Sequence, residues 1–222
     1  MLGTYTVVDV FRSGEFAGLA EGRYAPIARA YVERNSLGGT EFLIGKKHST
    51  DPLKDGRLTI PGGHIKRGEG YREAAIREAL EEAGVQAVAR SSSRFSHKVG
   101  DVIIKPRDDV TGVVVPVFGC NPAFWIYYKV SGKRYFCNLI DLKPVEGSTF
   151  EENPNSDLRE PRFISHREAF NKKGEFSPGT QLLLELIESE LNGNDIIGPH
   201  DIVVARDAAL YKHLQIAEPE ED

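Results

Sequence analysis

Residues 63–85 read GHIKRGEGYREAAIREALEEAGV and predict a loop followed by a helix. Within them, residues 71–83 are good helix formers without an internal Gly or Pro, and Gly84 supplies a stop. A helix turns through about 100° per residue, so its apolar side chains gather on one face, which we expect to be buried. That face consists of Ile76, Ala79, Leu80 and Ala83.

Glutamates occupy the opposite face of the predicted helix. Glu78 and Glu82 are four positions apart and Glu81 is three from Glu78, so the side chains can converge. Glu69 precedes the helix, where the helix dipole favours a carboxylate, and from there it can reach Arg77. Such a face is also typical of a solvated surface. Crowded carboxylates repel one another, however, and Mg²⁺ binds such oxygens together with substrate phosphates, which predicts metal-assisted chemistry on a phosphate ester or anhydride.

The spacing of these residues resembles the motif of the Nudix hydrolases, G-x5-E-x7-R-E-U-x-E-E-x-G-U, in which U is apolar. The motif matches without a gap, and Ala79 takes the apolar position inside the helix. The matching residues are Gly63, Glu69, Arg77, Glu78, Ala79, Glu81, Glu82, Gly84 and Val85. The resemblance implies an α/β Nudix fold, in which a mixed β-sheet is sandwiched between α-helices.

The same resemblance implies an Mg²⁺- or Mn²⁺-dependent hydrolase that cleaves a pyrophosphate bond in a nucleoside diphosphate linked to another moiety. The substrate is then a nucleotide sugar, an ADP-ribose-like compound or a nucleoside triphosphate. The catalytic residues implied are Glu69, Arg77, Glu78, Glu81 and Glu82. The metal ligands implied are Glu78, Glu81, Glu82 and the backbone carbonyl of Gly63, whereas Arg77 and Glu69 orient the loop.

Other residues are candidates for binding the substrate or completing the site. His64 directly follows Gly63, where a contact with phosphate or with the ligand loop is possible. The candidates for substrate contacts are Lys46, Arg57, His64, Lys98 and Lys105. A loop rich in Glu, Asn and Pro precedes the last predicted strand, and its candidates for a distal metal ligand or base are Glu151, Glu152 and Asp157.

Two alternative functions stay open, an RNA-decapping pyrophosphohydrolase and a catalytically silent nucleotide-binding protein. The acidic balance counts against an RNA path, although the segment 94–107 keeps it open. Silent relatives generally lose acidic residues of the motif, and all four glutamates are present here. An isopentenyl diphosphate isomerase is disfavoured because Trp125 is followed by Ile-Tyr-Tyr and both cysteines come late in the chain.

Composition limits the location and partners of the protein. The net charge of the 222 residues is −5, so bulk electrostatics does not favour nucleic acid or an anionic membrane. No stretch approaches the ~20 apolar residues of a membrane span, and the first residues lack signal-peptide features. We expect a cytoplasmic protein with Cys120 and Cys137 as thiols and a small nucleotide as its partner, and a homodimer stays open.

The sequence predicts three regions. Residues 1–24 form an N-terminal extension, residues 25–192 the Nudix hydrolase domain, and residues 193–222 a C-terminal helix and acidic tail. The predicted strands are 4–11, 27–33, 41–46, 85–90, 112–118, 124–130 and 134–140, and the last two form a hairpin. Three helices are predicted after residue 83: one begins at His166, and the others span 178–191 and 201–214. Residues 91–110 are expected to be a long loop or an inserted hairpin.

Overall fold

The computed structural model describes residues 23–52, 54–91, 102–106, 110–116, 122–128, 131–148, 153–192, 202–204 and 215–216. The predicted strand 4–11 and the acidic tail lie outside the described residues. Within the described part, no helix is both long and apolar enough to cross a membrane.

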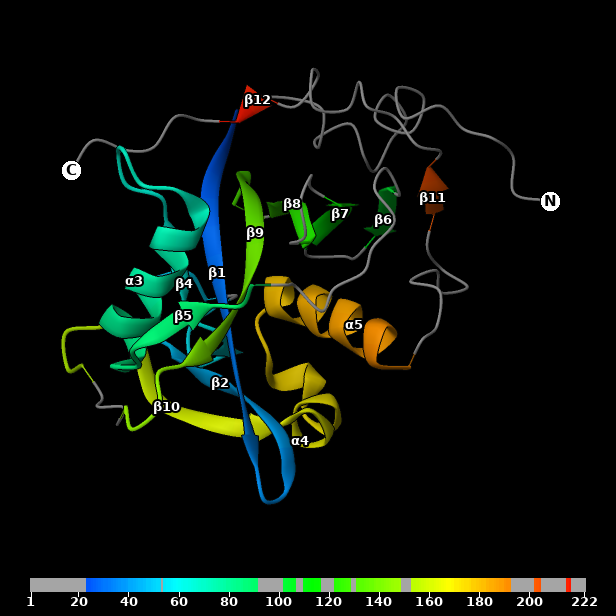
Figure 1. Ribbon diagram of the computed structural model, residues 1–222. Coiled ribbons are helices and arrows are strands. Elements are labelled where there is room, and N and C mark those ends of the chain that lie inside the picture. Colours follow the sequence, from blue (N-terminus) through cyan, green and yellow to red (C-terminus); the bar gives the residue numbers. More distant parts are fainter. Residues whose placement is uncertain are drawn as a thin grey trace.

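Two long strands, β1 (Arg23–Ser36) and β9 (Lys133–Pro144), pair in parallel at the centre of a mixed sheet (Figure 1). Strand β2 (Gly39–Lys47) forms an antiparallel hairpin with β1, and β10 (Leu158–Ser165) pairs with β2. The other strands are β3 (Leu58–Thr59), β4 (Gly62–His64), β5 (Ala87–Ala89), β6 (Val102–Pro106), β7 (Val110–Pro116), β8 (Pro122–Tyr128), β11 (Ile202–Val204) and β12 (Gln215–Ile216). The strand order among the described residues is β10-β2-β1-β9-β8-β7-β6-β11, with β3 beside β2, β4 and β12 beside β1, and β5 beside β9.

Helices cover both faces of this sheet, as predicted (Figure 1). Helix α3 (Tyr71–Ala83) packs on one face, and α4 (His166–Asn171) and α5 (Pro178–Asn192) pack on the other, joined by the short 3-10 helix η2 (Lys173–Glu175). Successive side chains of β1 alternate between the two cores: Ile27 and Tyr31 lie with α5, and Ala28 lies with α3. Because both faces are covered, the central strands read as nearly continuous apolar runs.

The boundaries of α3 agree with the prediction, and Ala79 and Ala83 are buried as predicted, but Leu80 is not. The face packed on the sheet carries Ala74, Ala75, Glu78, Ala79, Glu82 and Ala83. Leu80, predicted to be buried, is 49% exposed, whereas Glu78 and Glu82, predicted to lie on the face opposite the buried one, are only 8% and 6% exposed. Alanine side chains let the helix approach the sheet closely, so the face that carries the alanines packs on the sheet and Leu80 does not. The glutamates are thereby turned inward.

Several other predictions are confirmed. Strands β8 and β9 form the expected antiparallel hairpin, and β6 pairs with β7 within the region expected to be a loop or hairpin. Ser165 caps α4, because its hydroxyl accepts a hydrogen bond from the Glu168 amide at 3.2 Å. Cys137 is a buried free thiol, whereas Cys120 lies outside the described residues.

The prediction of a helix over residues 201–214 is wrong where the structure describes this segment. Residues 202–204 form strand β11, which pairs antiparallel with β6. They read Ile-Val-Val, and such β-branched side chains favour a strand once a partner strand is available. The remainder of the predicted helix lies outside the described residues.

Candidate active site

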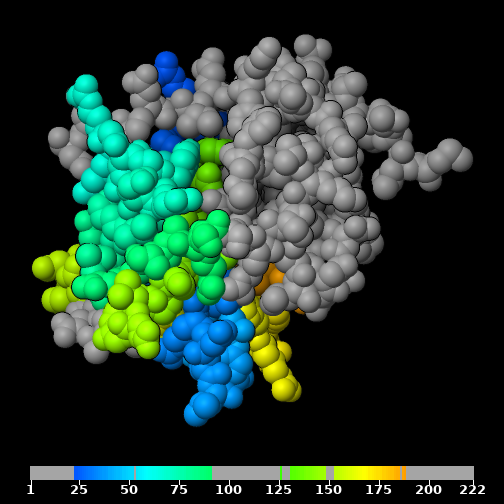
Figure 2. All heavy atoms as spheres, viewed as in Figure 1, coloured from blue at the N-terminus to red at the C-terminus, as the bar shows by residue number. Residues whose placement is uncertain are grey.

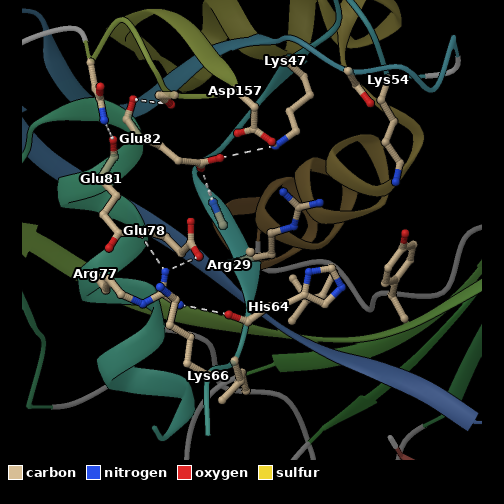
Figure 3. Close-up of a pocket in the computed structure, with 18 of the residues that line it drawn as sticks. Arg29, Lys47, Lys54, His64, Lys66, Arg77, Glu78, Glu81, Glu82 and Asp157 are labelled. Carbon is tan, nitrogen blue, oxygen red and sulfur yellow. Dashed lines mark hydrogen bonds and ion pairs between the residues drawn. The ribbon is translucent and has the colours of Figure 1, made fainter. Parts of the chain in front are cut away.

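A cavity of about 600 Å³ opens between α3, the β2–β3 loop and the segment that precedes β10 (Figure 3). In the space-filling view, the segment containing α3 forms one continuous part of the surface, above the segment that leads into β10 (Figure 2). The residues that line the cavity are Ile27, Arg29, Lys47, Ser49, Lys54, Gly62, Gly63, His64, Ile65, Lys66, Arg77, Glu78, Glu81, Glu82, Tyr135, Asn153, Asn155, Ser156 and Asp157. We call Glu78, Glu81, Glu82 and Asp157 the acidic wall of this cavity.

Two glycines allow α3 and β1 to approach the strand between them. Gly62 and Gly63 belong to β4, which pairs with β1. A Cβ atom on Gly62 would lie 2.5 Å from the backbone oxygen of Ala28. A Cβ atom on Gly63 would overlap the carboxylate of Glu78. The absence of side chains at both positions therefore brings the Gly63 backbone directly against a carboxylate of the acidic wall.

Arg77 ties the loop before α3 to the helix. Its guanidinium donates two hydrogen bonds to the Glu69 carboxylate, from Nε at 2.8 Å and from Nη2 at 3.0 Å, as the sequence predicted. Nη2 also donates to the carbonyl of His64 at 3.0 Å, while Nη1 donates to Glu78 at 2.7 Å and to Glu81 at 2.9 Å. The hydrogen bonds from Arg77 lower the pKa of the Glu69 carboxyl. One cation thus fixes the loop and two carboxylates of the acidic wall.

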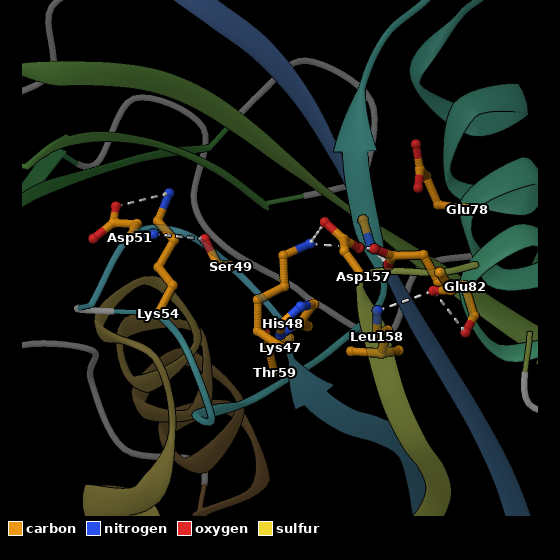
Figure 4. A network of polar contacts seen from close by, with 12 residues as sticks. Lys47, His48, Ser49, Asp51, Lys54, Thr59, Glu78, Glu82, Asp157 and Leu158 are labelled. Carbon is orange, nitrogen blue, oxygen red and sulfur yellow. Dashed lines mark hydrogen bonds and ion pairs between the residues drawn. The ribbon is translucent and has the colours of Figure 1, made fainter. Parts of the chain in front are cut away.

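Glu82 is the most deeply buried member of the acidic wall. Its carboxylate accepts a hydrogen bond from the Gly62 amide at 2.7 Å and lies 3.3 Å from the ammonium of Lys47. Lys47 also forms an ion pair with Asp157, so it bridges the two carboxylates (Figure 4). Burial, reinforced by the nearby Asp157, raises the pKa of Glu82 to about 8. Burial also raises the pKa of Glu78, although Arg77 opposes that shift.

The acidic wall has the donor chemistry of a site for a hard divalent cation. Its donors are carboxylate oxygens, and the backbone of Gly63 lies against Glu78. Burial of two carboxylates with raised pKa values is unfavourable unless positive charge compensates it. In the part of the chain that the structure describes, no three His, Cys, Asp or Glu side chains are gathered as a metal cluster, and Arg77 and Lys47 engage the carboxylates instead. The residues present therefore have the donor chemistry for a hard divalent cation, provided that these internal ion pairs rearrange.

The structure brings some of the predicted substrate-binding residues to the cavity and leaves others away from it. His64 and Asp157 line the cavity. Lys46 does not; its ammonium pairs with Glu160 at 2.8 Å, on the exposed surface. Arg57 does not line it either, because its guanidinium donates to the carbonyl of Gly174 at 2.9 Å. Lys98, Glu151 and Glu152 lie outside the described residues, and of Lys105 only the backbone, in β6, is described.

The cavity residues that were not predicted from the sequence include Lys47, Arg29, Lys54 and Tyr135. Lys47 lies one residue beyond the candidate Lys46, and alternation along a strand directs neighbouring side chains to opposite faces. The preceding residues of β2, Phe42 to Gly45, are all buried, so their pattern gives no signal that favours Lys47 over Lys46. Arg29, Lys54 and Tyr135 come from β1, the β2–β3 loop and β9, and no local spacing in the sequence connects them.

Comparison with known proteins gives one sequence family and many similar structures. The family profile of the NUDIX domain matches residues 24–181. An Ap4A hydrolase from C. elegans in a binary complex is 18% identical, with a TM-score of 0.47, over 76% of this chain and 98% of that chain. The MutT protein of Methanosarcina mazei Go1 is 16% identical, with a TM-score of 0.48, over 78% of this chain and 96% of that one. The Nudix hydrolase RenU from M. smegmatis is 15% identical, with a TM-score of 0.50, over 80% and 91%.

Proposed function

The chain belongs to the Nudix family of pyrophosphohydrolases, and from this premise we propose that it hydrolyses a pyrophosphate bond in a nucleoside diphosphate linked to another moiety. The observation that carries the proposal is the acidic wall, in which Glu78 and Glu82 are buried, have raised pKa values and line the cavity. Buried carboxylates with perturbed pKa values beside a cavity are typical of catalytic sites.

The proposed site assigns distinct tasks to the residues of α3 and its loop. Glu78, Glu81 and Glu82, with the carbonyl of Gly63, hold Mg²⁺ or Mn²⁺. When bound, such an ion neutralises the charge of the pyrophosphate and lowers the pKa of water. A carboxylate of the acidic wall within hydrogen-bond reach of the attacking water accepts its proton. Arg77 keeps these groups in place through its bonds to the loop and the helix.

Lys47 has a separate task in this proposal. In the metal-free protein its ammonium contacts the carboxyl groups of both Glu82 and Asp157. With an ion held by the glutamates, Lys47 would be available to pair with a phosphate of the substrate. The ion and Lys47 would together place positive charge beside the pyrophosphate, in a cavity whose acidic wall carries carboxyl groups.

The test is hydrolysis by the purified chain of a panel containing ADP-ribose, nucleotide sugars, dinucleoside polyphosphates, NADH and nucleoside triphosphates, with Mg²⁺ or Mn²⁺. Glu82→Gln removes a charge of the acidic wall, and Glu168→Gln, an exposed glutamate of α4 that pairs with Lys172, is the matched control. We expect turnover in the wild type and in E168Q, and a loss of at least a hundredfold in E82Q, as commonly follows removal of a group that stabilises developing charge. Folded protein that binds Mn²⁺ but cleaves no member of the panel would refute the proposal and favour capped RNA or a binding role.

A further inference from the structure

The cavity has a basic side as well as an acidic wall. Arg29, from β1, and Lys54, from the β2–β3 loop, both line it. In the close-up view, Arg29 lies between the glutamates of α3 and Lys54, with Lys54 on the side remote from the helix (Figure 3). We call Arg29 and Lys54 the basic pair. Neither residue belongs to the loop–helix motif.

Lys54 is held at the cavity by its own loop. The amides of Lys54 and Asp55 both donate to the carbonyl of Asp51 at 2.9 Å, which forms a turn. The loop is closed at its base, because the Gly56 amide donates to the Lys47 carbonyl at 2.8 Å. The Lys54 ammonium lies 4.8 Å from the centre of the Tyr135 ring, which favours a cation at this position. Lys54 is therefore fixed at the cavity, and its side chain is only 17% exposed.

The basic pair brings two positively charged side chains to the cavity. Asp51 forms an ion pair with Lys54 at 3.8 Å (Figure 4). Burial, followed by the like charge of Arg29, lowers the pKa of the Lys54 ammonium. Arg29 donates a long hydrogen bond, at 3.4 Å, to the carbonyl of Ile60, also contacts the thiol of Cys137, and forms no ion pair within the described residues. A partly buried ammonium and a guanidinium thus face one cavity.

We propose that Arg29 and Lys54 form an anion subsite that binds a further phosphate of the substrate, beyond the pyrophosphate held at the acidic wall. This inference rests on the proposed function and narrows its substrate class. The preferred substrates carry an additional phosphate, as a nucleoside triphosphate or a dinucleoside polyphosphate does. Nucleoside diphosphates linked to an uncharged sugar place no further phosphate at the basic pair and are poorer substrates.

The geometry suits a phosphate rather than a neutral group. The guanidinium of Arg29 offers paired N–H donors, and the ammonium of Lys54 is a point charge, a combination that matches the oxygens of phosphate. A neutral sugar hydroxyl in the same place would leave two like charges close together in a partly dehydrated site. The Tyr135 ring lies beside the Lys54 cation, and its centroid is 6.2 Å from that of the His64 ring. Tyr135 therefore supports the subsite from one side.

The test compares two substrates of the same nucleoside, ATP and ADP-ribose, in wild type, Lys54→Gln, Lys54→Arg and the exposed control Lys172→Gln. The measured quantity is the ratio of kcat/KM for ATP to kcat/KM for ADP-ribose. We expect this ratio to fall at least about tenfold in K54Q, because a charged hydrogen bond to the extra phosphate is lost. K54R keeps the charge and retains most of the preference, and K172Q leaves the ratio unchanged. An equal loss on both substrates in K54Q, or no loss, would overturn the inference.

A binding measurement separates this inference from the proposed function. Inorganic tripolyphosphate is titrated calorimetrically into the wild-type, K54Q and K172Q proteins in the presence of Ca²⁺, with thermal unfolding of each variant as a folding control. Weaker binding in K54Q alone supports the subsite even if the panel shows no hydrolysis, in which case the proposed function fails and the subsite stands. Hydrolysis of ATP and ADP-ribose with an unchanged ratio, and equal tripolyphosphate binding in all three proteins, leaves the function standing and removes the subsite.

Discussion

Gly62 and Gly63 are adjacent, but substituting each with alanine is expected to have different consequences for stability and for metal binding. In Gly62→Ala the new Cβ atom would lie 2.5 Å from the backbone oxygen of Ala28, which is fixed within β1. Overpacking against a backbone that cannot move costs about 1–3 kcal/mol of unfolding free energy. In Gly63→Ala the atoms within reach belong to the flexible end of the Glu78 side chain, so the strain is relieved by moving that carboxylate. We expect a stability loss below about 1 kcal/mol in G63A, because a flexible side chain yields more easily than a backbone.

The two substitutions also differ in their effect on metal binding. G63A displaces Glu78 from the acidic wall, and misplacing a group that supports a metal site typically costs ten- to a hundredfold in affinity. Unfolding free energies come from urea titrations in EDTA, and Mn²⁺ affinities from calorimetry. Gly174→Ala is the control, because nothing lies within 4 Å of a Cβ atom there. Mn²⁺ affinity in G63A equal to that of G174A, or a stability loss in G63A as large as in G62A, would refute this account of the two glycines.

Three further predictions test the site and the fold. Because the pKa of Glu82 is raised to about 8 in the folded protein from an ordinary value of 4.5, the folded state holds a proton that the unfolded chain has lost between these values. The unfolding free energy of the metal-free protein should therefore fall as pH rises from 4.5 to 8, by at most about 1.4 kcal/mol per pH unit. Urea titrations at pH 5, 6.5 and 8 should show that this free energy depends less on pH in E82Q than in the wild type. Parallel pH profiles in the two proteins would contradict the raised pKa of Glu82. Arg77→Lys loses the two-pronged contact with Glu69, so we expect about 2 kcal/mol less stability and a lower kcat; unchanged kcat at full folding would exclude an orienting role. Ser165→Ala removes the cap of α4 and should cost about 1 kcal/mol while leaving kcat/KM unchanged, which differential scanning calorimetry and the substrate panel together check.

The parts of the site that the sequence predicts are local in the chain. The loop and helix that carry Glu69, Arg77 and the glutamates of the acidic wall span 23 residues, positions 63–85, and their contacts follow from helical spacing. The contact of Glu69 with Arg77 depends on eight residues of sequence separation, and it is present as expected. Gly84 ends the helix in a left-handed conformation, with its amide donating to Leu80 at 2.8 Å, for the same local reason.

The parts that the sequence does not predict depend on pairing between distant segments. Lys47 meets Asp157 because β10 pairs with β2 in a register that sets Leu158 opposite Lys47. That register shifts between Arg159 and Arg162, where the pairing is irregular, and such a shift changes which side chains face the cavity. Lys54 and Tyr135 likewise meet only through the fold of the sheet. Hydrophobic periodicity describes one element at a time, so it cannot specify these contacts.

The orientation of α3 is a physical reason to regard its glutamates as functional. Rotating the helix so that Leu80 faced the sheet would bury an apolar side chain and release Glu78 and Glu82 to water, which the hydrophobic effect favours by itself. The structure instead leaves Leu80 half exposed and buries both carboxylates. It compensates them with Arg77 and Lys47, residues that a solvated helical face would not require. A local arrangement that lowers stability in this way is expected at a site that is retained for its chemistry. Replacing the buried carboxylate in E82Q should therefore raise the unfolding free energy at pH 8 while abolishing turnover.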